Sequence, residues 1–237
     1  MTTNEPTIFA LGGGGWMMEP DNPLLDDFVL SLAGTDRPRI ALLPTATGDR
    51  EGVIARFYEA FSGKARPTYL PLFRRDRPVE LLLEQDVVYV SGGNTVNALA
   101  IWRAHGVDRI LRQCWERGVV LSGLSAGSLC WYEAGVTDSF RAAEMDPLDD
   151  GLGFLPGSHC PHYDGEARRR PLYTELVRSG RLAPGVAATD GAGLVYRGTT
   201  LSSVVTSRPE AAAWRVHADG RHEALPARYL GASADQS

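Results

Sequence analysis

Short apolar segments alternate with amphipathic helical patterns along the first two-thirds of this 237-residue chain. The expected strands occupy residues 7–11, 39–43, 68–70, 86–90 and 118–122. Helical spacing of apolar residues appears at 24–32, 53–61, 95–105 and 107–115. Such alternation favours parallel strands joined by crossover helices, with functional sites at the carboxyl ends of the strands. We therefore predict an α/β fold, a three-layer, doubly wound, mostly parallel sheet with helices on both faces.

The last third of the chain has a different pattern. Residues 191–207 alternate around Arg197-Gly198, which indicates an antiparallel hairpin. A second hairpin is expected at 214–225, where Asp219-Gly220 supplies the turn. No Pro- or Ser-rich linker separates the two parts, so we expect one domain over residues 1–237, with C-terminal antiparallel hairpins and a flexible tail at 231–237.

Composition excludes several classes of function. The net charge of −5 and the pI near 5.6 argue against nucleic acid or an anionic membrane as the main partner. The three cysteines are odd in number and fit no zinc spacing, which favours reduced thiols and no metal site. The first residues lack the basic and apolar stretches of a signal peptide, and no apolar run approaches a membrane span. We expect a cytoplasmic protein.

The segment Gly-Leu-Ser-Ala-Gly-Ser at residues 123–128 is the candidate catalytic motif. It follows the apolar run at 118–122, so the Gly-x-Ser-x-Gly pattern lies at a strand-to-helix turn. Small residues at Gly123 and Gly127 let backbone segments approach closely, and the turn presents the Ser125 hydroxyl at a helix N-terminus. A glycine-rich turn with no catalytic role is the competing interpretation. Cys130 is a weaker nucleophile candidate, because it lies inside the helix five residues beyond Ser125.

A serine nucleophile needs a base, and the chain has five histidines. His217 and His222 lie in the expected second hairpin, and His105 lies at a helix end, where a capping role is sufficient. His159 and His162 remain, in a polar loop-like segment that contains proline and glycine. Pro161 restricts the backbone directly before His162.

The sequence identifies the acid that would orient the histidine, and the oxyanion donors, less specifically than it identifies the serine. Asp138 lies where the chain returns after the helix that begins at Ser125, and Glu133 is the alternative acid. For four other acids the neighbouring sequence gives weaker support for this role: Asp146, Asp149, Asp150 and Asp190. The glycine-rich turn Ser91-Gly92-Gly93-Asn94, after another strand, can place a backbone N–H beside that of Ala126 to form an oxyanion hole. Neither that turn nor the glycine run at 12–15 has the residue spacing of a phosphate-binding loop. Their glycines are explained by close approach of the backbone to a ligand or by packing of the turn.

Three blocks in this order resemble the peptidase E branch of the peptidase E/cyanophycinase serine peptidases: Ser91-Gly92-Gly93-Asn94-Thr95, Gly123-Leu124-Ser125-Ala126-Gly127-Ser128 and Cys160-Pro161-His162-Tyr163. With the strand–helix alternation, the resemblance extends over roughly residues 7–205. It implies a class I glutamine amidotransferase-like fold in which serine replaces the usual elbow cysteine. It also implies Ser125 as nucleophile, His162 as base, Gly93 and Ala126 as oxyanion donors, and an acid on or next to Asp138.

The resemblance also implies a substrate class. Peptidase E cleaves dipeptides that begin with aspartate and holds the aspartyl carboxylate with an arginine in a Gly-Glu-Thr-Arg stretch. Gly165-Glu166-Ala167-Arg168 is similar, although its loop from His162 is shorter, so Arg168 and Asn94 are the expected substrate ligands. No metal or organic cofactor is expected, and the expected partner is a small peptide bound by a monomer or homodimer. The alternatives are a cyanophycinase-like or other amide hydrolase, and a non-catalytic binding or sensing protein.

Overall fold

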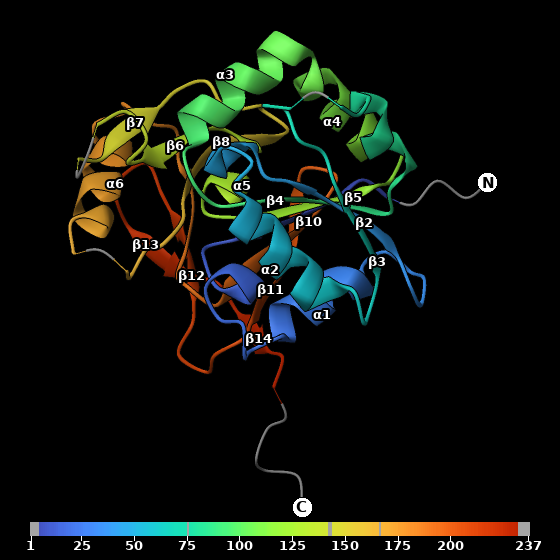
Figure 1. Ribbon diagram of the computed structural model, residues 1–237. Helices are drawn as coiled ribbons and strands as arrows, with labels where there is room; N and C mark the ends of the chain where they lie inside the picture. Colours follow the sequence, from blue (N-terminus) through green and yellow to red (C-terminus); the bar gives the residue numbers. More distant parts are fainter. Residues whose placement is uncertain (1–4, 75, 142–143, 166, 232–237) are drawn as a thin grey trace, which may run out of the picture.

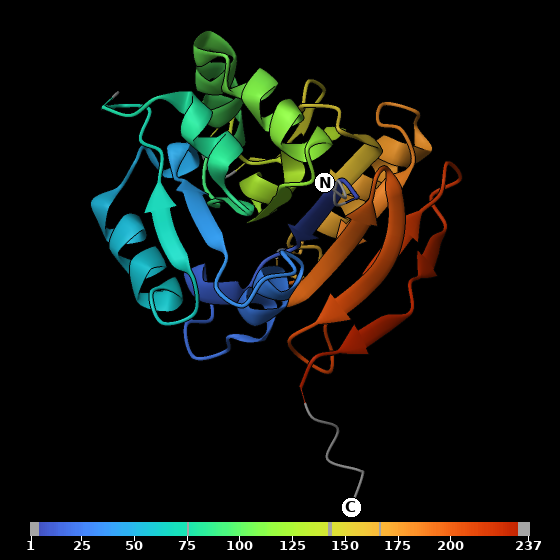
Figure 2. The same cartoon turned by 90° about the vertical axis from the view of Figure 1, so that its right-hand side faces the viewer.

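Two β-sheets lie side by side in the computed structural model, which describes residues 5–231 except 75, 142–143 and 166 (Figure 1). The larger sheet has helices on both faces, and the smaller sheet carries one long helix (Figures 1 and 2). Most of the expected flexible tail at 231–237 lies outside the described residues. Among the described residues, no helix has the length and apolar character that a membrane crossing requires.

The larger sheet has eight strands and is mostly parallel. Its order is β14 (Ala227–Tyr229), β11 (Thr200–Thr206), β10 (Ala192–Arg197), β1 (Thr7–Leu11), β5 (Val120–Leu124), β4 (Val87–Val90), β2 (Arg39–Leu43) and β3 (Arg66–Tyr69). Strands β1, β5, β4, β2 and β3 run parallel, whereas β10 is antiparallel to both β1 and β11. The predicted parallel core and the first predicted hairpin are therefore confirmed.

The helices divide between the faces of this sheet. Their bounds are α1 (Leu24–Ser31), α2 (Glu51–Phe61), α3 (Thr95–His105), α4 (Val107–Glu116), α5 (Ala126–Leu129) and α6 (Arg169–Arg178), with 3-10 turns at Gly15–Met17, Thr45–Thr47 and Val79–Glu84. Side chains alternate along each strand: Ile8 of β1 packs with the cluster of α3 and α4, and Phe9 with that of α1 and α2. The predicted layers of helices on both faces are confirmed.

The smaller sheet is the part of the fold that the sequence pattern did not predict, apart from its β12–β13 hairpin. Its order is β13 (His222–Ala224), β12 (Ala213–Val216), β9 (Gly185–Ala188), β8 (Leu155–Cys160), β6 (Tyr132–Thr137) and β7 (Asp146–Leu148). Helix α6 packs on it through Tyr173 and Val177. Strands β8 and β9 are parallel neighbours, so both end at the same edge.

Candidate active site

Ser125 lies on a strained turn between β5 and α5. Its backbone has φ 55° and ψ −114°, a region that non-glycine residues rarely adopt, and its N–H donates to the Leu11 carbonyl at 3.2 Å. A Cβ on Gly127 would lie 2.3 Å from the Val90 carbonyl oxygen, and one on Gly123 would lie 2.5 Å from the same atom. The two glycines therefore allow the turn to pack against the end of β4, as the sequence pattern predicts.

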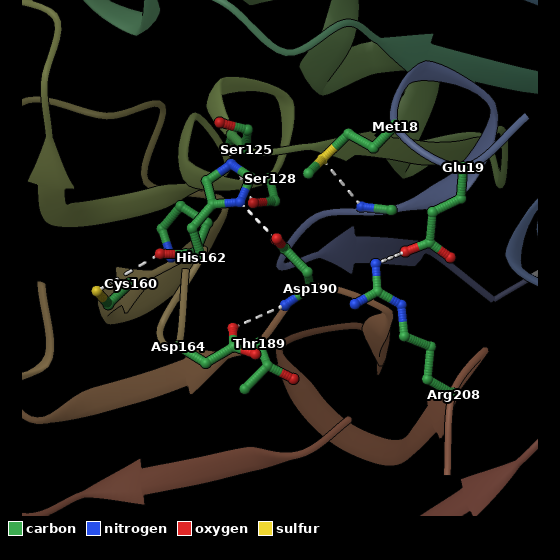
Figure 3. Close-up of polar contacts among 12 residues, drawn as sticks. Met18, Glu19, Ser125, Ser128, Cys160, His162, Asp164, Thr189, Asp190 and Arg208 are labelled. Atoms are coloured by element: carbon green, nitrogen blue, oxygen red, sulfur yellow. Dashed lines mark hydrogen bonds and ion pairs between the residues drawn. The ribbon is translucent and has the colours of Figure 1, made fainter. Parts of the chain in front are cut away.

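His162 and Asp190 form a polar pair in the pocket that Ser125 lines. His162 Nδ1 lies 2.5 Å from Asp190 Oδ1, and because a carboxylate accepts, the imidazole donates from Nδ1. The Nε2 atom is then left with its lone pair for a second partner. Figure 3 shows the imidazole between Asp190 and Ser125, and all three residues line one pocket.

The acid that contacts His162 is Asp190, and this corrects the expected Asp138. The physical reason is the pairing of β8 with β9, in which Cys160 lies opposite Ala187. His162 lies two residues after β8 and Asp190 two residues after β9, so the shared sheet edge brings them together. Asp190 is held further by its own backbone N–H, which donates to Asp164 Oδ1 at 3.1 Å.

The glycine run after β1 supports this pair. The Gly12 carbonyl accepts the His162 N–H at 3.0 Å, and the Gly13 carbonyl accepts the Gly191 N–H at 3.0 Å. A Cβ on Gly13 would lie 2.0 Å from Asp190 Oδ1 and 2.9 Å from His162 Cε1. The run therefore passes directly beside the histidine–aspartate pair, a role that its sequence alone did not reveal.

Two backbone N–H groups are available near the Ser125 side chain. Ala126 is the first residue of α5, so its N–H has no partner within the helix. Gly93 follows β4, the neighbour of β5, and lines the same pocket as Ser125. Its φ of 132° and a Cβ position only 2.3 Å from the Ala46 carbonyl oxygen make glycine necessary there. The arrangement can supply two donors to a developing oxyanion.

The pocket has a volume of about 500 Å³ and combines charges of both signs. Its lining residues are Gly93, Asn94, Ser125, Asp138, Ser139, His162, Gly165, Arg169 and Asp190. Arg169 is only 3% exposed, whereas Asp138 is an exposed residue of the lining. A buried guanidinium on such a wall is a suitable receptor for a carboxylate.

Several expected site residues lie elsewhere or have other partners. Arg168 is exposed and does not line the pocket. Helix α6 begins at the next residue, Arg169, and it is the Arg169 side chain that is buried and lines the pocket. Glu133, the alternative acid, accepts the Gly157 N–H at 2.8 Å instead of reaching His162. Glu166, part of the motif that pointed to Arg168, lies outside the described residues.

Asn94 lines the pocket, but its amide is engaged at both ends. Its Oδ1 accepts the Asn97 N–H at 2.8 Å and so caps α3. Its Nδ2 donates to the Ser139 carbonyl at 2.9 Å, which ties down the segment that carries Asp138. Asn94 therefore positions the pocket wall.

His159 and Cys130 are both buried beneath the turn. His159 Nδ1 lies 2.8 Å from the Val186 carbonyl, Nε2 lies 3.2 Å from Ser128 Oγ, and the ring stacks on Tyr132. Burial lowers the pKa of His159 to about 4, so the ring is neutral at pH 7. Burial raises the pKa of Cys130 well above its usual range, which leaves a protonated, inert thiol. Neither residue lines the pocket.

No group of three or more His, Cys, Asp or Glu side chains is close enough to hold a metal ion within the part of the chain that the structure describes. The residues around Ser125 are suited to proton transfer and to binding of charged groups. They include Ser125, His162 and Asp190, the residue types of a catalytic triad, together with two candidate oxyanion donors.

Comparisons with known proteins show the family and the fold of the chain. The model of "Peptidase family S51" matches residues 8–204. The chain is 48% identical over 231 residues to "Uncharacterized peptidase YgaJ" of Bacillus subtilis (strain 168), covering 94% of this chain and 99% of that protein. It is 28% identical over 142 residues to "Peptidase E" of Shewanella denitrificans, covering 56% of this chain and 60% of that protein. The crystal structure of a peptidase from an acI-B1 actinobacterium has the same fold, with a TM-score of 0.73 at 19% identity, covering 95% and 96% of the two chains.

Proposed function

Because the chain belongs to peptidase family S51, we propose that it is a serine peptidase that hydrolyses short peptides through an acyl-enzyme on Ser125. The observation that carries the proposal is the 2.5 Å hydrogen bond between His162 and Asp190 in the pocket that Ser125 lines. In the neutral imidazole this bond requires the proton on Nδ1, which leaves the Nε2 lone pair to act as a base.

In the first half of the reaction, His162 Nε2 removes the hydroxyl proton as Ser125 Oγ attacks the scissile carbonyl carbon. The carbonyl π electrons move to oxygen, and the N–H groups of Gly93 and Ala126 stabilise the resulting oxyanion. When the tetrahedral intermediate collapses, the C–N bond breaks and the imidazolium gives its proton to the leaving amine. Asp190 stabilises the imidazolium throughout.

In the second half, water attacks the acyl-enzyme carbonyl carbon and gives a proton to His162 Nε2. Collapse of the second intermediate breaks the bond to Ser125 Oγ, which takes that proton back. The products are a carboxylic acid and an amine, and Ser125 and His162 are restored.

The charges of the pocket support peptides with an acidic first residue. Arg169 is suited to the side-chain carboxylate of that residue, and Asp138 to its α-ammonium group. The two receptors lie in one pocket with Ser125, so a free N-terminus and an acidic side chain can be recognised together. In this proposal Asp138 is a substrate ligand, and Arg169 replaces Arg168 in the role that the sequence resemblance implied.

The test is hydrolysis of aspartyl-p-nitroanilide, its N-acetyl derivative, and the dipeptides Asp-Leu and Leu-Leu. We expect turnover of aspartyl-p-nitroanilide and Asp-Leu, no turnover with Ser125→Ala, and poor turnover of Leu-Leu. N-acetylation removes the ammonium charge and should lower kcat/KM about 10- to 100-fold, as should Arg169→Gln. The matched control Arg168→Gln should retain full activity, because Arg168 lies outside the pocket.

Each part of the proposal can be contradicted separately. Equal activity of the wild type and Ser125→Ala would contradict the serine mechanism. Efficient cleavage of Leu-Leu with no cleavage of Asp-Leu would contradict the assignment of Arg169 while leaving the Ser125 chemistry intact. Equal rates for the free and acetylated substrates would contradict the assignment of Asp138.

A further inference from the structure

A second pocket, with a volume of about 530 Å³, lies beside α6 and the β12–β13 hairpin, a region visible in Figure 1. Its apolar walls include Tyr163, Pro171 and Trp214, and the rings of Tyr163 and Trp214 touch with centroids 5.5 Å apart. It lies next to the pocket of Ser125, since Gly165 and Arg169 line that pocket while their chain neighbours Asp164 and Arg170 line this one.

Arg170 supplies the cationic group of the second pocket. Its guanidinium carbon lies 5.5 Å from the ring centroids of both Tyr163 and Trp214. Its Nη2 lies 3.0 Å from His222 Nδ1, which accepts the hydrogen bond because a guanidinium can only donate. Within the described ranges, no hydrogen bond or ion pair joins Arg170 to a carboxylate, so its remaining N–H groups are available to an anion.

The histidine that orients Arg170 is itself held in place. With Nδ1 accepting, the His222 proton is on Nε2, which faces the hydroxyls of Thr174 at 2.9 Å and Tyr163 at 3.1 Å. The Thr174 hydroxyl donates to the Arg170 carbonyl at 2.8 Å and can therefore accept from His222. The guanidinium is thus preorganised by a closed network, which reduces the entropy cost of binding an anion.

The two acidic residues of this pocket already have partners. Glu175 forms a two-pronged ion pair with Arg178, with contacts of 2.7 to 3.0 Å. Asp164 Oδ1 accepts the backbone N–H of Asp190 at 3.1 Å. The Glu175 charge is thus paired with Arg178, and one oxygen of the Asp164 carboxylate is bound to the backbone near Asp190, while Arg170 is the cationic side chain that lines the pocket.

We propose that this second pocket binds a small carboxylate that has an apolar, preferably aromatic, body. The carboxylate lies on the Arg170 guanidinium, and the apolar body covers Pro171 and the exposed part of the Trp214 ring. The site goes beyond the peptidase chemistry proposed for Ser125 and does not depend on it, because no residue of this pocket takes part in that mechanism.

The test is isothermal titration calorimetry of the full-length protein with 3-phenylpropanoate, and with phenethylamine as the probe of opposite charge. We expect saturable binding of 3-phenylpropanoate, and at least about tenfold weaker binding by Arg170→Gln. Trp214→Leu should weaken binding as a second, independent variant. Arg168→Gln is the matched control on the same segment and should bind as the wild type does, because Arg168 lines neither pocket. Circular dichroism of each variant identifies any that fails to fold.

Four results would overturn the proposal. They are no saturable binding of 3-phenylpropanoate to the wild type, unchanged binding by folded Arg170→Gln, equal weakening by Arg168→Gln, and tighter binding of phenethylamine than of the carboxylate. Binding that persists in Arg170→Gln but disappears in Arg169→Gln would move the carboxylate to the pocket of Ser125 and would equally contradict the proposal.

Discussion

Among the described residues, three that are not glycine have positive φ angles, and two of these are Ser125 and His162. Such conformations cost of order 1–3 kcal/mol each and persist only where the surroundings hold them. For Ser125 the support is the bond from its N–H to Leu11, and for His162 it is the bond from its N–H to Gly12. Both supports come from the end of β1, so one short segment holds the two strained residues.

This dependence leads to a prediction for two adjacent glycines. Gly13→Ala should lower kcat about 100-fold or more, because the new Cβ would push Asp190 Oδ1 away from His162. The displaced atom ends a side chain, so we expect the free energy of unfolding to change little. Gly12→Ala would instead place Cβ 2.3 Å from the Thr189 carbonyl oxygen, and we expect it to destabilise the whole fold.

Steady-state kinetics and urea unfolding of the two variants distinguish these effects. Gly52→Ala is the control, because no atom lies within 4 Å of the added Cβ and the residue is inside helix α2. It should stabilise the protein by about 0.5–1 kcal/mol. Normal kcat in folded Gly13→Ala would show that the glycine run does not position the pair.

At the scale of the elements, the nucleophile turn rests on the smaller sheet through Ser128. Ser128 Oγ lies 2.8 Å from the Ser125 carbonyl and 3.2 Å from Nε2 of the buried His159. The Nδ1 atom of His159 in turn contacts the Val186 carbonyl of β9. A chain of polar contacts therefore joins α5 to β8 and β9. The same two strands carry His162 and Asp190 at their ends.

Ser128→Ala should lower the free energy of unfolding by about 1–3 kcal/mol, because it removes the buried hydroxyl whose single proton serves either the Ser125 carbonyl or Nε2 of the neutral His159. We also expect a lower kcat, since the carbonyl of Ser125 loses its side-chain contact. Urea denaturation together with kinetics measures both effects. Ser202→Ala, at an exposed position of β11, is the control and should change neither quantity.

Strands β1, β2, β4 and β5 of the parallel core could be predicted because they consist largely of apolar side chains that are buried on both faces. Strands β8 and β9 have no comparable pattern, since Leu155–Cys160 contains proline, glycine, serine and histidine. Their pairing joins segments that are separated by α6, and no local pattern specifies it. For this reason Ser125 and His162 could be found from local motifs, whereas Asp190 was ranked below Asp138.

The choice between adjacent arginines has a similar cause. Arg168, Arg169 and Arg170 have the same chemistry, and only the start of α6 at Arg169 decides which one turns into which pocket. A shift of one residue rotates a helical side chain by about 100°. The sequence therefore indicates a cationic segment, but it does not determine which of its arginines faces the pocket.

At the scale of the whole molecule, the packing of the larger sheet includes a buried carboxyl group. Asp26, only 5% exposed, lies in α1 near Trp16 and Tyr89, and burial raises its pKa to about 7. In the unfolded chain an aspartate titrates near its ordinary pKa of 3.8. Between these values the folded state binds more protons, so the contribution of Asp26 to stability decreases as the pH rises from about 4 to about 7.

Asp26→Asn should therefore be more stable than the wild type above pH 7, by up to about 4 kcal/mol. Near pH 4 the two proteins should have similar stability, because the native carboxyl group is then protonated. Urea denaturation at several pH values between 4 and 8 measures the difference. A difference that is independent of pH would contradict the raised pKa. Asp27→Asn, at an exposed position of the same helix, is the control.

The central claim is that Ser125, His162 and Asp190 act together, with Asp138 assigned to substrate binding. The most direct measurement is the rate at which a fluorophosphonate labels Ser125, followed by intact mass and peptide mapping, because it needs no knowledge of the substrate. We expect one adduct on Ser125 in the wild type, about 10²- to 10⁴-fold slower labelling in Asp190→Asn, and near wild-type labelling in Asp138→Asn. No adduct, an adduct on another residue, or slowing by Asp138→Asn with none by Asp190→Asn would contradict this assignment.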